Sequence, residues 1–273
     1  MIVTVKLLNG ADLAGFIKER QARQVRALRQ AEGVVPHLAI IRTNPDSVVD
    51  SYMKLKQAYG EDIQVEVTVH TIEQSKALDL INSLNKDEAV HGIIVQIPLP
   101  DPSQTEEVLR AVVANKDVDG LAGKTDFDPP TPMAINWLVA GYNIALQDKE
   151  IVIVGQGRLV GEPLTKLWRA SNYKVTTLDR NSENIGGETR RADVLVCATG
   201  RPGLITPDMV KPAAVIVDAG VATDSNGLSG DVHPDVRQMP DITITPEKGG
   251  VGPLTVCALF ENVIRAARAH IEK

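Results

Sequence analysis

The first half of the chain alternates between strand-like apolar runs and segments with apolar residues at helical spacing. Residues 9–32 place apolar side chains at helical spacing among many charged ones, and Asn9 and Gly33 suit the start and the end of a helix. Beyond Gly33, strands are predicted over residues 37–42, 63–69 and 91–97, followed by helices that run through about residue 59, over 72–84 and over 104–113. This order predicts a parallel sheet covered on both faces.

A proline-rich segment separates this half from a second one with the same alternation. Residues 126–132 hold too many prolines for a helix interior, and Pro132 suits the first turn of a new helix. The predicted strands that follow cover residues 151–154, 174–178, 194–198, 214–217 and 242–245, with a weak helix over 182–189 and a last helix over about 255–270. We therefore predict the α/β class, with two α/β domains whose parallel-rich sheets flank a cleft.

The last helix is expected to return to the first domain. The first domain then comprises residues 1–131 plus 251–273, and the second, Rossmann-like domain comprises residues 132–250.

Composition and charge exclude several classes of function. With 43% hydrophobic and 23% charged residues, the chain has the composition of a soluble globular protein. Its net charge of −6 argues against nucleic acid or an anionic membrane as the main partner. The two cysteines, Cys197 and Cys257, lie in apolar runs and are expected to be buried thiols, so we predict neither a disulfide scaffold nor a metal site.

The N-terminal segment lacks the pattern of a secretory signal, because no long apolar stretch follows a basic start. No apolar run approaches the roughly 20 residues that a membrane-spanning helix needs. We expect a cytoplasmic protein.

A glycine-rich turn follows the predicted strand at residues 151–154. Glycines in a turn between a strand and a helix let the backbone approach a pyrophosphate, whose charge then lies at the helix N-terminus. The third glycine comes one residue later than in the common Gly-x-Gly-x-x-Gly pattern, so a tight turn without a ligand is the alternative. The predicted cofactor-binding residues of this turn are Gly155, Gln156, Gly157, Arg158, Val160 and Gly161.

Asp179 and Arg180 end the next predicted strand and bear on the choice of cofactor. An acidic side chain there can accept hydrogen bonds from the adenosine ribose, which favours NAD. Arg180 and Arg158 favour NADP, because guanidinium groups bind phosphate well. A solvated charge pair is the alternative for Arg180, and the choice between the two cofactors stays open.

Four polar residues of the first domain form a second candidate group. Tyr52 and Lys56 are four residues apart on a predicted helix and so share one face. A lysine in a partly desolvated cleft can have a lowered pKa and exchange protons. Gln96 ends an apolar strand and Asp119 lies in a turn. A solvated lysine and a solvated turn aspartate are the alternatives for Lys56 and Asp119, whereas a buried amide at Gln96 would need partners. These residues gain weight only together with the nucleotide turn.

These residues lie in motifs that run in one order over residues 36–262. The most specific are Gln96-Ile97-Pro98-Leu99-Pro100, Lys116-Asp117-Val118-Asp119-Gly120 and Gly249-Gly250-Val251-Gly252-Pro253-Leu254-Thr255. With these motifs the chain resembles the bifunctional methylenetetrahydrofolate dehydrogenase/methenyltetrahydrofolate cyclohydrolase family.

The resemblance implies two reactions. The family oxidises 5,10-methylenetetrahydrofolate by hydride transfer to a nicotinamide cofactor, usually NADP, and hydrolyses the methenyl product to 10-formyltetrahydrofolate. It implies that Lys56 is the main acid/base of hydrolysis and that Gln96 tunes its protonation. Tyr52 would stack near the folate ring system and Asp119 would bind the pterin nitrogens. The resemblance also implies a homodimer.

By the same resemblance, further residues contact the two ligands. The folate substrate would contact Val95, Ile97, Pro98, Leu99, Gly249, Gly250, Val251, Gly252, Pro253 and Thr255. The cofactor would also contact Thr199, Gly200 and Val221.

The chain departs from the family pattern at positions that affect these expectations. Gly155-Gln156-Gly157 stands where the family usually has Gly-Arg-Ser, and Asp179-Arg180 replaces His-Ser, where a 2′-phosphate would be held. Counting from Asn44 without a gap places the catalytic lysine at Lys54, whereas a two-residue insertion gives Tyr52 and Lys56. We favour Lys56, because stacking needs an aromatic residue.

Three other functions remain as alternatives. They are a dehydrogenase with little cyclohydrolase activity, another two-domain oxidoreductase such as a shikimate-dehydrogenase-like enzyme, and a nucleotide sensor without catalysis.

Overall fold

The computed structural model describes residues 5–44, 47–224 and 227–271, and their side chains except at 47–52, 223–224 and 227–228. The described chain divides into two compact units. Unit 1 contains the described residues up to Ala14 and Thr131–Thr255, and unit 2 contains Gly15–Pro130 and the residues from Val256 onward.

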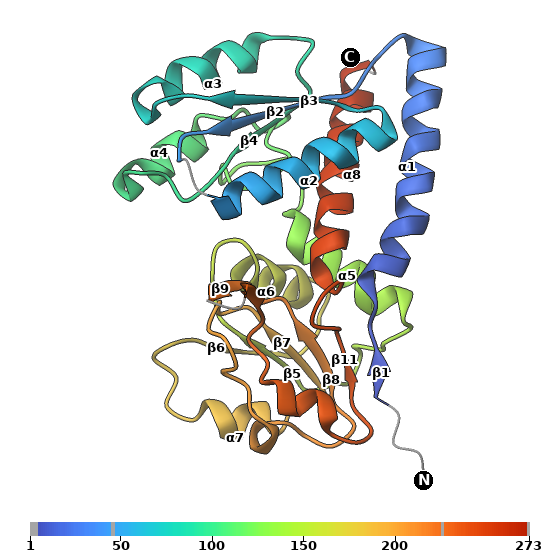
Figure 1. Cartoon of the computed structure of the whole chain (residues 1–273), viewed down its shortest axis with the longest axis vertical. Coiled ribbons are helices and arrows are strands. Elements are labelled where there is room, and N and C mark those ends of the chain that lie inside the picture. The colour runs from blue at the N-terminus through green and yellow to red at the C-terminus, as the bar shows by residue number, and fades with distance from the viewer. Residues whose placement is uncertain (1–4, 45–46, 225–226, 272–273) are drawn as a thin grey trace. The chain divides into compact units, whose positions relative to one another are not determined.

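Unit 2 is built on a three-stranded parallel sheet with the order β3-β2-β4. The strands are β2 (His37–Arg42), β3 (Glu66–Thr71) and β4 (Gly92–Val95). The helices of this unit are α2 (Ser47–Ile63), α3 (Ala77–Lys86) and α4 (Thr105–Arg110), together with most of α1 (Gly10–Glu32) and α8 (Val251–Ile271). Figure 1 shows α2 and α3 on opposite sides of the sheet.

The central strand β2 explains how the two faces are covered. Successive side chains of a strand point to opposite faces, so a central strand that is buried on both faces is apolar throughout. Leu38 and Ile40 pack in one cluster with residues of α1, α2 and α8. Ala39 and Ile41 pack in another with residues of α3 and α4. All four side chains have no exposed surface.

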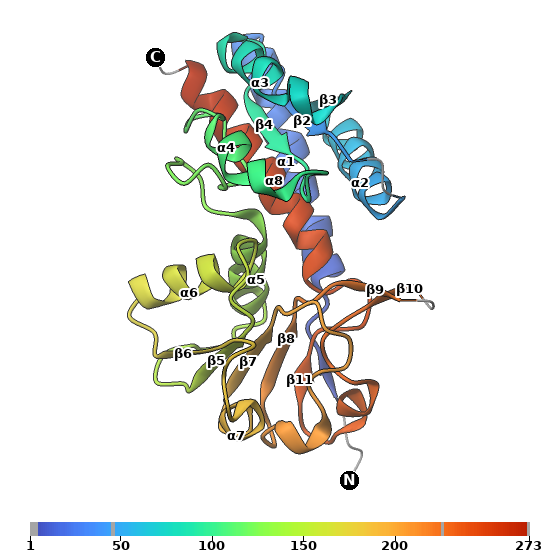
Figure 2. The same ribbon diagram turned by 90° about the vertical axis from the view of Figure 1, so that its left-hand side faces the viewer.

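Unit 1 contains a six-stranded sheet with the order β1-β11-β8-β7-β5-β6, and every pair in it is parallel. The strands are β1 (Lys6–Leu7), β5 (Ile151–Val154), β6 (Val175–Leu178), β7 (Val194–Cys197), β8 (Val215–Asp218) and β11 (Thr243–Ile244). The helices are α5 (Pro130–Gly141), α6 (Gly161–Ala170) and α7 (Ile185–Thr189), and β9 (Ala222–Asp224) pairs with β10 (Gly227–Ser229). Figure 2 shows β5, β7, β8 and β11 next to one another.

The strand order of unit 1 reverses at β5. The chain passes from β5 to β6 on one side, and β7 and β8 then follow on the other side. In open parallel sheets, ligands bind outside the carboxyl ends of the strands at such a reversal. The turns after β5 and β7 therefore border the expected ligand position.

The predicted α/β class with parallel sheets is confirmed, and so are both ends of the first helix. The Asn9 side chain accepts a hydrogen bond from the Ala11 N–H at 3.1 Å, and Gly33 has a φ of 67° just after Glu32. An N-cap side chain and a glycine in the left-handed region are the usual ends of a helix.

Three boundaries that were expected from the sequence are wrong. Residues 5–14 were assigned to the first domain, but β1 pairs with β11 in the sheet of unit 1. The strand expected over 63–69 begins three residues late, because Ile63 ends α2 and Gln64 turns the chain with a φ of 65°. Helix α8 begins at Val251 rather than Thr255, because Pro253 falls in its first turn, where no N–H donor is needed.

Among the residues that the structure describes, no helix is both long and apolar enough to cross a membrane.

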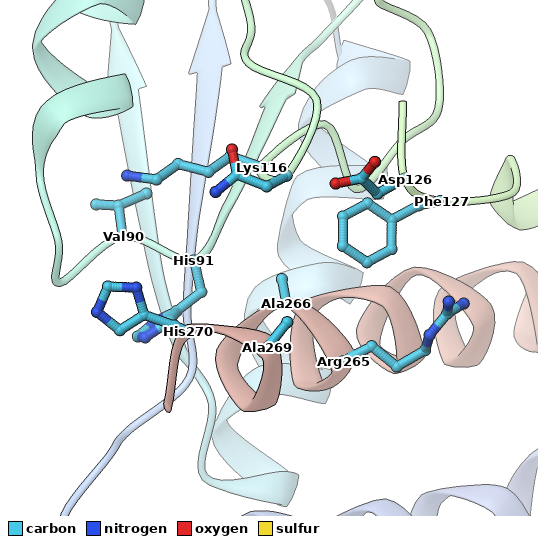
Figure 3. Close-up of a pocket in the computed structure, with 10 residues that line it drawn as sticks. Val90, His91, Lys116, Asp126, Phe127, Arg265, Ala266, Ala269 and His270 are labelled. Atoms are coloured by element: carbon cyan, nitrogen blue, oxygen red, sulfur yellow. The ribbon is translucent and has the colours of Figure 1, made fainter. Parts of the chain in front are cut away.

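A cavity of about 180 Å³ lies in unit 2 before the amino end of β4, opposite the end that carries Gln96 (Figure 3). Its lining includes His91, whose Nδ1 accepts the His37 N–H at 3.2 Å and whose ring meets that of His270 edge-on at 5.6 Å. Burial, with the nearby His270, His37 and Lys116, lowers the pKa of His91 to about 4. The folded protein thus holds this imidazole in its neutral form.

This depressed pKa predicts acid sensitivity. Unfolded histidine has a pKa of about 6.5. Between that value and about 4, the unfolded chain binds a proton that folded His91 does not, so the free energy of unfolding falls as the pH falls. Urea denaturation of the wild type and His91→Gln should show a shallower pH dependence for the variant over this window. Equal slopes in the two proteins would contradict the assigned environment of His91.

Candidate active site

Unit 2 brings Lys56, Gln96 and Asp119 into one electrostatic group. Lys56 lies on α2, and its Nζ donates a hydrogen bond to Gln96 Oε1 at 3.2 Å. Gln96 directly follows β4, and its backbone N–H bonds Ile41 O at 2.9 Å, which extends the pairing with β2 by one residue. The carboxylate of Asp119 acts on Lys56 through its charge. Three of the predicted catalytic residues are thus close together.

The environment of Lys56 suits an amine that exchanges protons. Burial lowers the pKa of Lys56, and the charge of Asp119 opposes this effect without cancelling it. The amide of Gln96 accepts a hydrogen bond from the amine but carries no net charge, so it does not favour the ammonium form as strongly as a carboxylate would. The Gln96 Nε2 donates to Ile97 O at 3.2 Å, which keeps Oε1 directed at the lysine.

Two polar side chains hold the turn that carries Asp119: Asp117 of the same motif, and Asn262, which the sequence did not suggest. Asp117 accepts the N–H groups of Leu121 at 3.2 Å and Ala122 at 2.8 Å. The buried Asn262 of α8 donates to Val118 O and to Asp128 O, both at 2.9 Å. Asn262 could have been found as a single amide at a buried helical position in an otherwise apolar stretch.

Burial raises the pKa of Asp119, the charge of Lys56 lowers it, and the charge of Asp117 raises it further. The charged carboxylate of Asp119 is therefore disfavoured by its surroundings, and hydrogen-bond donors from a ligand would stabilise it.

The structure separates the two candidate lysines. Lys56 is half-buried and bonded to Gln96, whereas Lys54 is exposed. Residues two apart on a helix do not face the same way, so only one of the two can lie against Gln96. The side chain of Tyr52 lies outside the described residues.

The predicted substrate-binding residues at the end of β4 and after it differ in exposure. Val95 and Leu99 are 3% and 2% exposed and pack in the core with α3 and α4. Ile97 is half-buried and Pro98 is exposed, so these two are the members that a ligand can reach.

The remaining predicted substrate-binding residues, from Gly249 to Thr255, belong to unit 1. Gly249 has a φ of 83° and its carbonyl accepts the Ala11 N–H at 2.9 Å. Val251 is buried, Gly250 is buried, Gly252 is exposed and Pro253 is half-buried. These residues were expected as a loop, but from Val251 onward they form the first turn of α8, where Thr255 Oγ1 bonds Val251 O at 3.3 Å.

The glycine turn after β5 has the geometry of a dinucleotide site. A Cβ on Gly155 would lie 2.3 Å from Ala198 O, and one on Gly161 would lie 1.8 Å from Gly155 O, so no side chain fits at either position. A Cβ on Gly157 would meet no atom within 4 Å. The turn is therefore packed on its inner side and open at Gly157, next to the N-terminus of α6, where a pyrophosphate fits.

The other residues of this turn vary in exposure. Arg158 is exposed and Val160 is half-buried. The side chain of Gln156 donates to Gly155 O at 3.0 Å and accepts from Thr165 Oγ1 at 3.2 Å, which ties the turn to α6.

The predicted residues after the neighbouring strands lie at the same edge of the sheet. Asp179 and Arg180 follow β6 and are exposed, and Thr199 and Gly200 follow β7. Val221 lies beyond β8 and is 54% exposed, which is unusual for valine. The Asp179 Oδ1 accepts from Asn181 N at 2.9 Å and from Ser182 Oγ at 3.2 Å, so the carboxylate is fixed in a turn.

Over residues 5–44, 47–224 and 227–271, no group of three or more His, Cys, Asp or Glu side chains is arranged to hold a metal ion.

Replacing Asp119 with asparagine should lower the pKa of Lys56 further, because the carboxylate charge that raises it is removed. Lysine methylation with ¹³C label and NMR titration measures this pKa directly. Lys54, which is exposed, provides a reference resonance in the same spectrum. An unchanged or raised pKa of Lys56 in Asp119→Asn would show that the two groups do not interact.

Comparisons with known proteins point to one family along nearly the whole chain. The family profile of the tetrahydrofolate dehydrogenase/cyclohydrolase catalytic domain matches residues 8–119. The profile of the NAD(P)-binding domain of tetrahydrofolate dehydrogenase/cyclohydrolase matches residues 129–271. The bifunctional protein FolD of Bordetella bronchiseptica is 35% identical over 283 residues, which cover 97% of this chain and 98% of that protein.

Solved structures give the same result. The bifunctional enzyme FolD of Campylobacter jejuni, a methylenetetrahydrofolate dehydrogenase/cyclohydrolase, superposes with a TM-score of 0.91 at 32% identity, over 97% of this chain and 99% of that chain. The Trypanosoma brucei enzyme in complex with NADP and an inhibitor superposes with a TM-score of 0.92 at 25% identity, over the full length of both chains. The chain therefore belongs to the tetrahydrofolate dehydrogenase/cyclohydrolase family.

Proposed function

We propose that this protein is a bifunctional enzyme. It oxidises 5,10-methylenetetrahydrofolate to the 5,10-methenyl form with NAD(P), and it hydrolyses that product to 10-formyltetrahydrofolate. The observation that carries the proposal is the Lys56–Gln96 hydrogen bond beside Asp119, in a chain whose two parts match the catalytic and NAD(P)-binding domains of one family. Similarity to bifunctional relatives supports both activities.

Lys56 is the proposed acid/base of the hydrolysis. Water adds to the methenyl carbon and loses a proton to the neutral amine of Lys56. The resulting ammonium returns a proton to N5 as the bond between that carbon and N5 breaks. The hydroxyl group of the adduct loses its proton to solvent as its C=O bond forms, which leaves the formyl group on N10. An amine whose pKa is lowered by burial releases its proton more readily than a solvated lysine does, which suits Lys56 to proton transfer. Gln96 holds the amine at a fixed position through both steps.

Asp119 and Tyr52 are the proposed binding residues for the folate ring system. A buried carboxylate gains most from N–H donors, and the pterin presents amino and ring N–H groups. Stacking by Tyr52 rests on the family resemblance. Ile97 and Pro98, the members of the predicted run that are not buried, are proposed to line the rest of the folate site in unit 2.

The dehydrogenase reaction is proposed to use NAD(P) held by unit 1. When bound, the nicotinamide ring supplies the hydride acceptor, so the protein contributes alignment and no acid or base. The open backbone at Gly157 and the N-terminus of α6 are proposed to bind the pyrophosphate. Thr199, Gly200 and Val221 are proposed to border the nicotinamide. Unit 2 would then be the folate-binding part and unit 1 the cofactor-binding part.

We also propose a homodimer, and this proposal rests on the family resemblance. Strand β6 lies at an edge of the six-stranded sheet and is available for such an association. The cytoplasmic location expected from the sequence stays a prediction.

Loss of Lys56 should separate the two activities. General acid–base catalysis is worth about 100- to 10,000-fold, so Lys56→Met should slow methenyl hydrolysis by at least about 100-fold while binding of NAD(P) is kept. Absorbance assays with methenyltetrahydrofolate measure the effect, and Lys54→Met is the matched control, expected to keep wild-type rates. A normal rate of hydrolysis in Lys56→Met would contradict the assignment of Lys56 as the acid/base.

The same assays on the wild type separate the competing functions. Slow hydrolysis with normal dehydrogenation would favour a dehydrogenase that has lost the second activity. If neither NAD nor NADP supports turnover of methylenetetrahydrofolate, the proposed function is contradicted.

The cofactor preference should depend on Asp179 and Arg180. Asp179→Ser removes a carboxylate that repels a 2′-phosphate, and it should raise the kcat/KM ratio of NADP to NAD roughly tenfold, the equivalent of about 1.4 kcal/mol. Arg180→Ser, at the neighbouring position, should lower the same ratio. Steady-state kinetics with both cofactors give the ratio. A ratio that neither variant changes would mean that the adenosine ribose binds elsewhere.

A further inference from the structure

Two buried carboxylates lie beneath the turns that follow β7 and β8. The last residues of these strands, Cys197 and Asp218, are neighbours in the sheet. Asp231 is fully buried, and the side chain of Asp218 is 4% exposed. Burying a carboxylate costs free energy unless its oxygens accept hydrogen bonds. The hydrogen-bond donors of Asp218 and Asp231 therefore identify the segments that the two carboxylates hold in place.

Asp231 binds the backbone of the turn after β7. Its Oδ2 accepts the Thr199 N–H at 2.5 Å and its Oδ1 accepts the Arg201 N–H at 2.9 Å. The Arg201 N–H also lies 3.1 Å from Thr199 Oγ1. Gly200, between the two donors, has a φ of 67°. Backbone turns of this kind form a small concave site for anions, and here an internal carboxylate occupies it.

Asp218 joins this turn to the one after β8. Its Oδ1 accepts the N–H of Gly220 at 3.2 Å and the N–H of Asp231 at 3.0 Å. Its Oδ2 accepts the N–H of Val232 at 3.1 Å and lies 3.4 Å from Arg237 Nη2. The carboxylate at the end of β8 therefore fixes both its own turn and the segment that carries Asp231.

Two glycines make room for this arrangement. A Cβ on Gly220 would lie 2.1 Å from the Asp231 carboxyl group, and a Cβ on Gly230 would lie 2.1 Å from Asp218 Oδ2. Any other residue at either position would displace a carboxylate. The backbone is therefore shaped around the two acids.

The turns that these acids hold carry exposed residues. Gly200 is exposed, and Val221, directly after Gly220, is 54% exposed although it is apolar. Gly200 follows β7, a neighbour of β5, where the strand order reverses and ligands are expected, and Val221 follows β8, the next strand beyond β7. Because the Thr199 and Arg201 amides already bind Asp231, these turns cannot offer those two donors to a ligand.

We propose that Asp231 is a positioning residue for the dehydrogenase reaction: it fixes the Thr199–Arg201 turn, and with Asp218 the Gly220–Val221 turn, in the shape that receives the nicotinamide half of NAD(P). The inference rests on the proposed function, in which these turns border the cofactor. It adds that the cofactor meets Gly200 and Val221, while the N–H groups of Thr199 and Arg201 serve the protein alone.

The first test needs no cofactor. Asp231→Asn keeps the size of the side chain but replaces one carboxylate oxygen with an amide NH2 group. One of the two backbone N–H groups therefore loses its acceptor. Hydrogen exchange of the protein without ligand should show faster exchange of the Thr199 and Arg201 amides in this variant, by roughly tenfold or more, because a bond to a charged acceptor is lost. Unchanged protection of both amides would overturn the inference.

The second test separates positioning from folding. In Asp231→Asn the Kd and KM of NAD(P) should rise by about tenfold or more. Hydrolysis of methenyltetrahydrofolate, assayed without cofactor, should stay within about twofold of wild type, because Lys56, Gln96 and Asp119 belong to unit 2. A change that only destabilised the protein would lower both activities together and would also overturn the inference.

Asp193→Asn is the matched control. Asp193 also accepts a backbone N–H, that of Glu150 at 3.0 Å, and binds Lys211 Nζ at 2.6 Å, but it precedes β7 and so lies at the opposite end of that strand from Thr199. Its replacement should leave the KM of NAD(P) unchanged. An equal rise of the KM in Asp193→Asn would assign the effect to general loosening of unit 1.

If Asp231→Asn does not fold, Asp231→Glu tests the same point, since it keeps the charge but moves the carboxylate by one methylene. It too should raise the KM of NAD(P) and spare hydrolysis, and normal cofactor binding in it would overturn the inference. Failure of the wild type to bind NAD(P) would instead refute the proposed function, whatever the exchange data show.

Discussion

The hydrogen bond between Lys56 and Gln96 is the interaction on which the proposed chemistry of this protein depends. An amine in water is protonated at neutral pH and cannot accept a proton, so it needs an environment that disfavours its charge. Burial provides that environment for Lys56, and a neutral amide holds it there at 3.2 Å. The charge of Asp119 opposes the effect of burial on the pKa of Lys56, and burial is the larger of the two effects.

Secondary structure and core packing keep these groups in place. Gln96 extends the pairing of β4 with β2, whose side chains are buried on both faces, and it therefore has little freedom to move. Lys56 is carried by α2, which packs on the same sheet through Met53 and Ile63. In unit 1, glycines and buried acids fix the shape of the turns at the ends of β5, β7 and β8.

Much of this could be predicted from the sequence. Strands such as β2 and β5 were predicted with their observed ends, because a buried parallel strand is a short apolar run with polar residues on either side. The glycine turn after β5 was predicted because glycines lie between a strand and a helix, and the structure leaves no room for a side chain at Gly155 and Gly161. Lys56 and Gln96 were predicted from motif order, and the structure brings their side chains into contact.

Other features could not be read from the sequence, for physical reasons. Residues 5–14 were placed in the wrong domain, since β1 spans only Lys6–Leu7 and its position depends on pairing with β11, far along the chain. The role of Asp231 arises from its contacts with the backbone N–H groups of a turn, which depend on the fold and not on the spacing of side chains. Val95 and Leu99 lie in a motif of the family, but their side chains belong to the core.

A crystal structure of the protein with a bound folate analogue would test the central claim most directly. The claim predicts that the pterin donates hydrogen bonds to the Asp119 carboxylate and that the Lys56 Nζ, still bonded to Gln96, lies within reach of the carbon between N5 and N10. A folate bound away from Lys56, or one that leaves Asp119 without contact to the pterin, would contradict it.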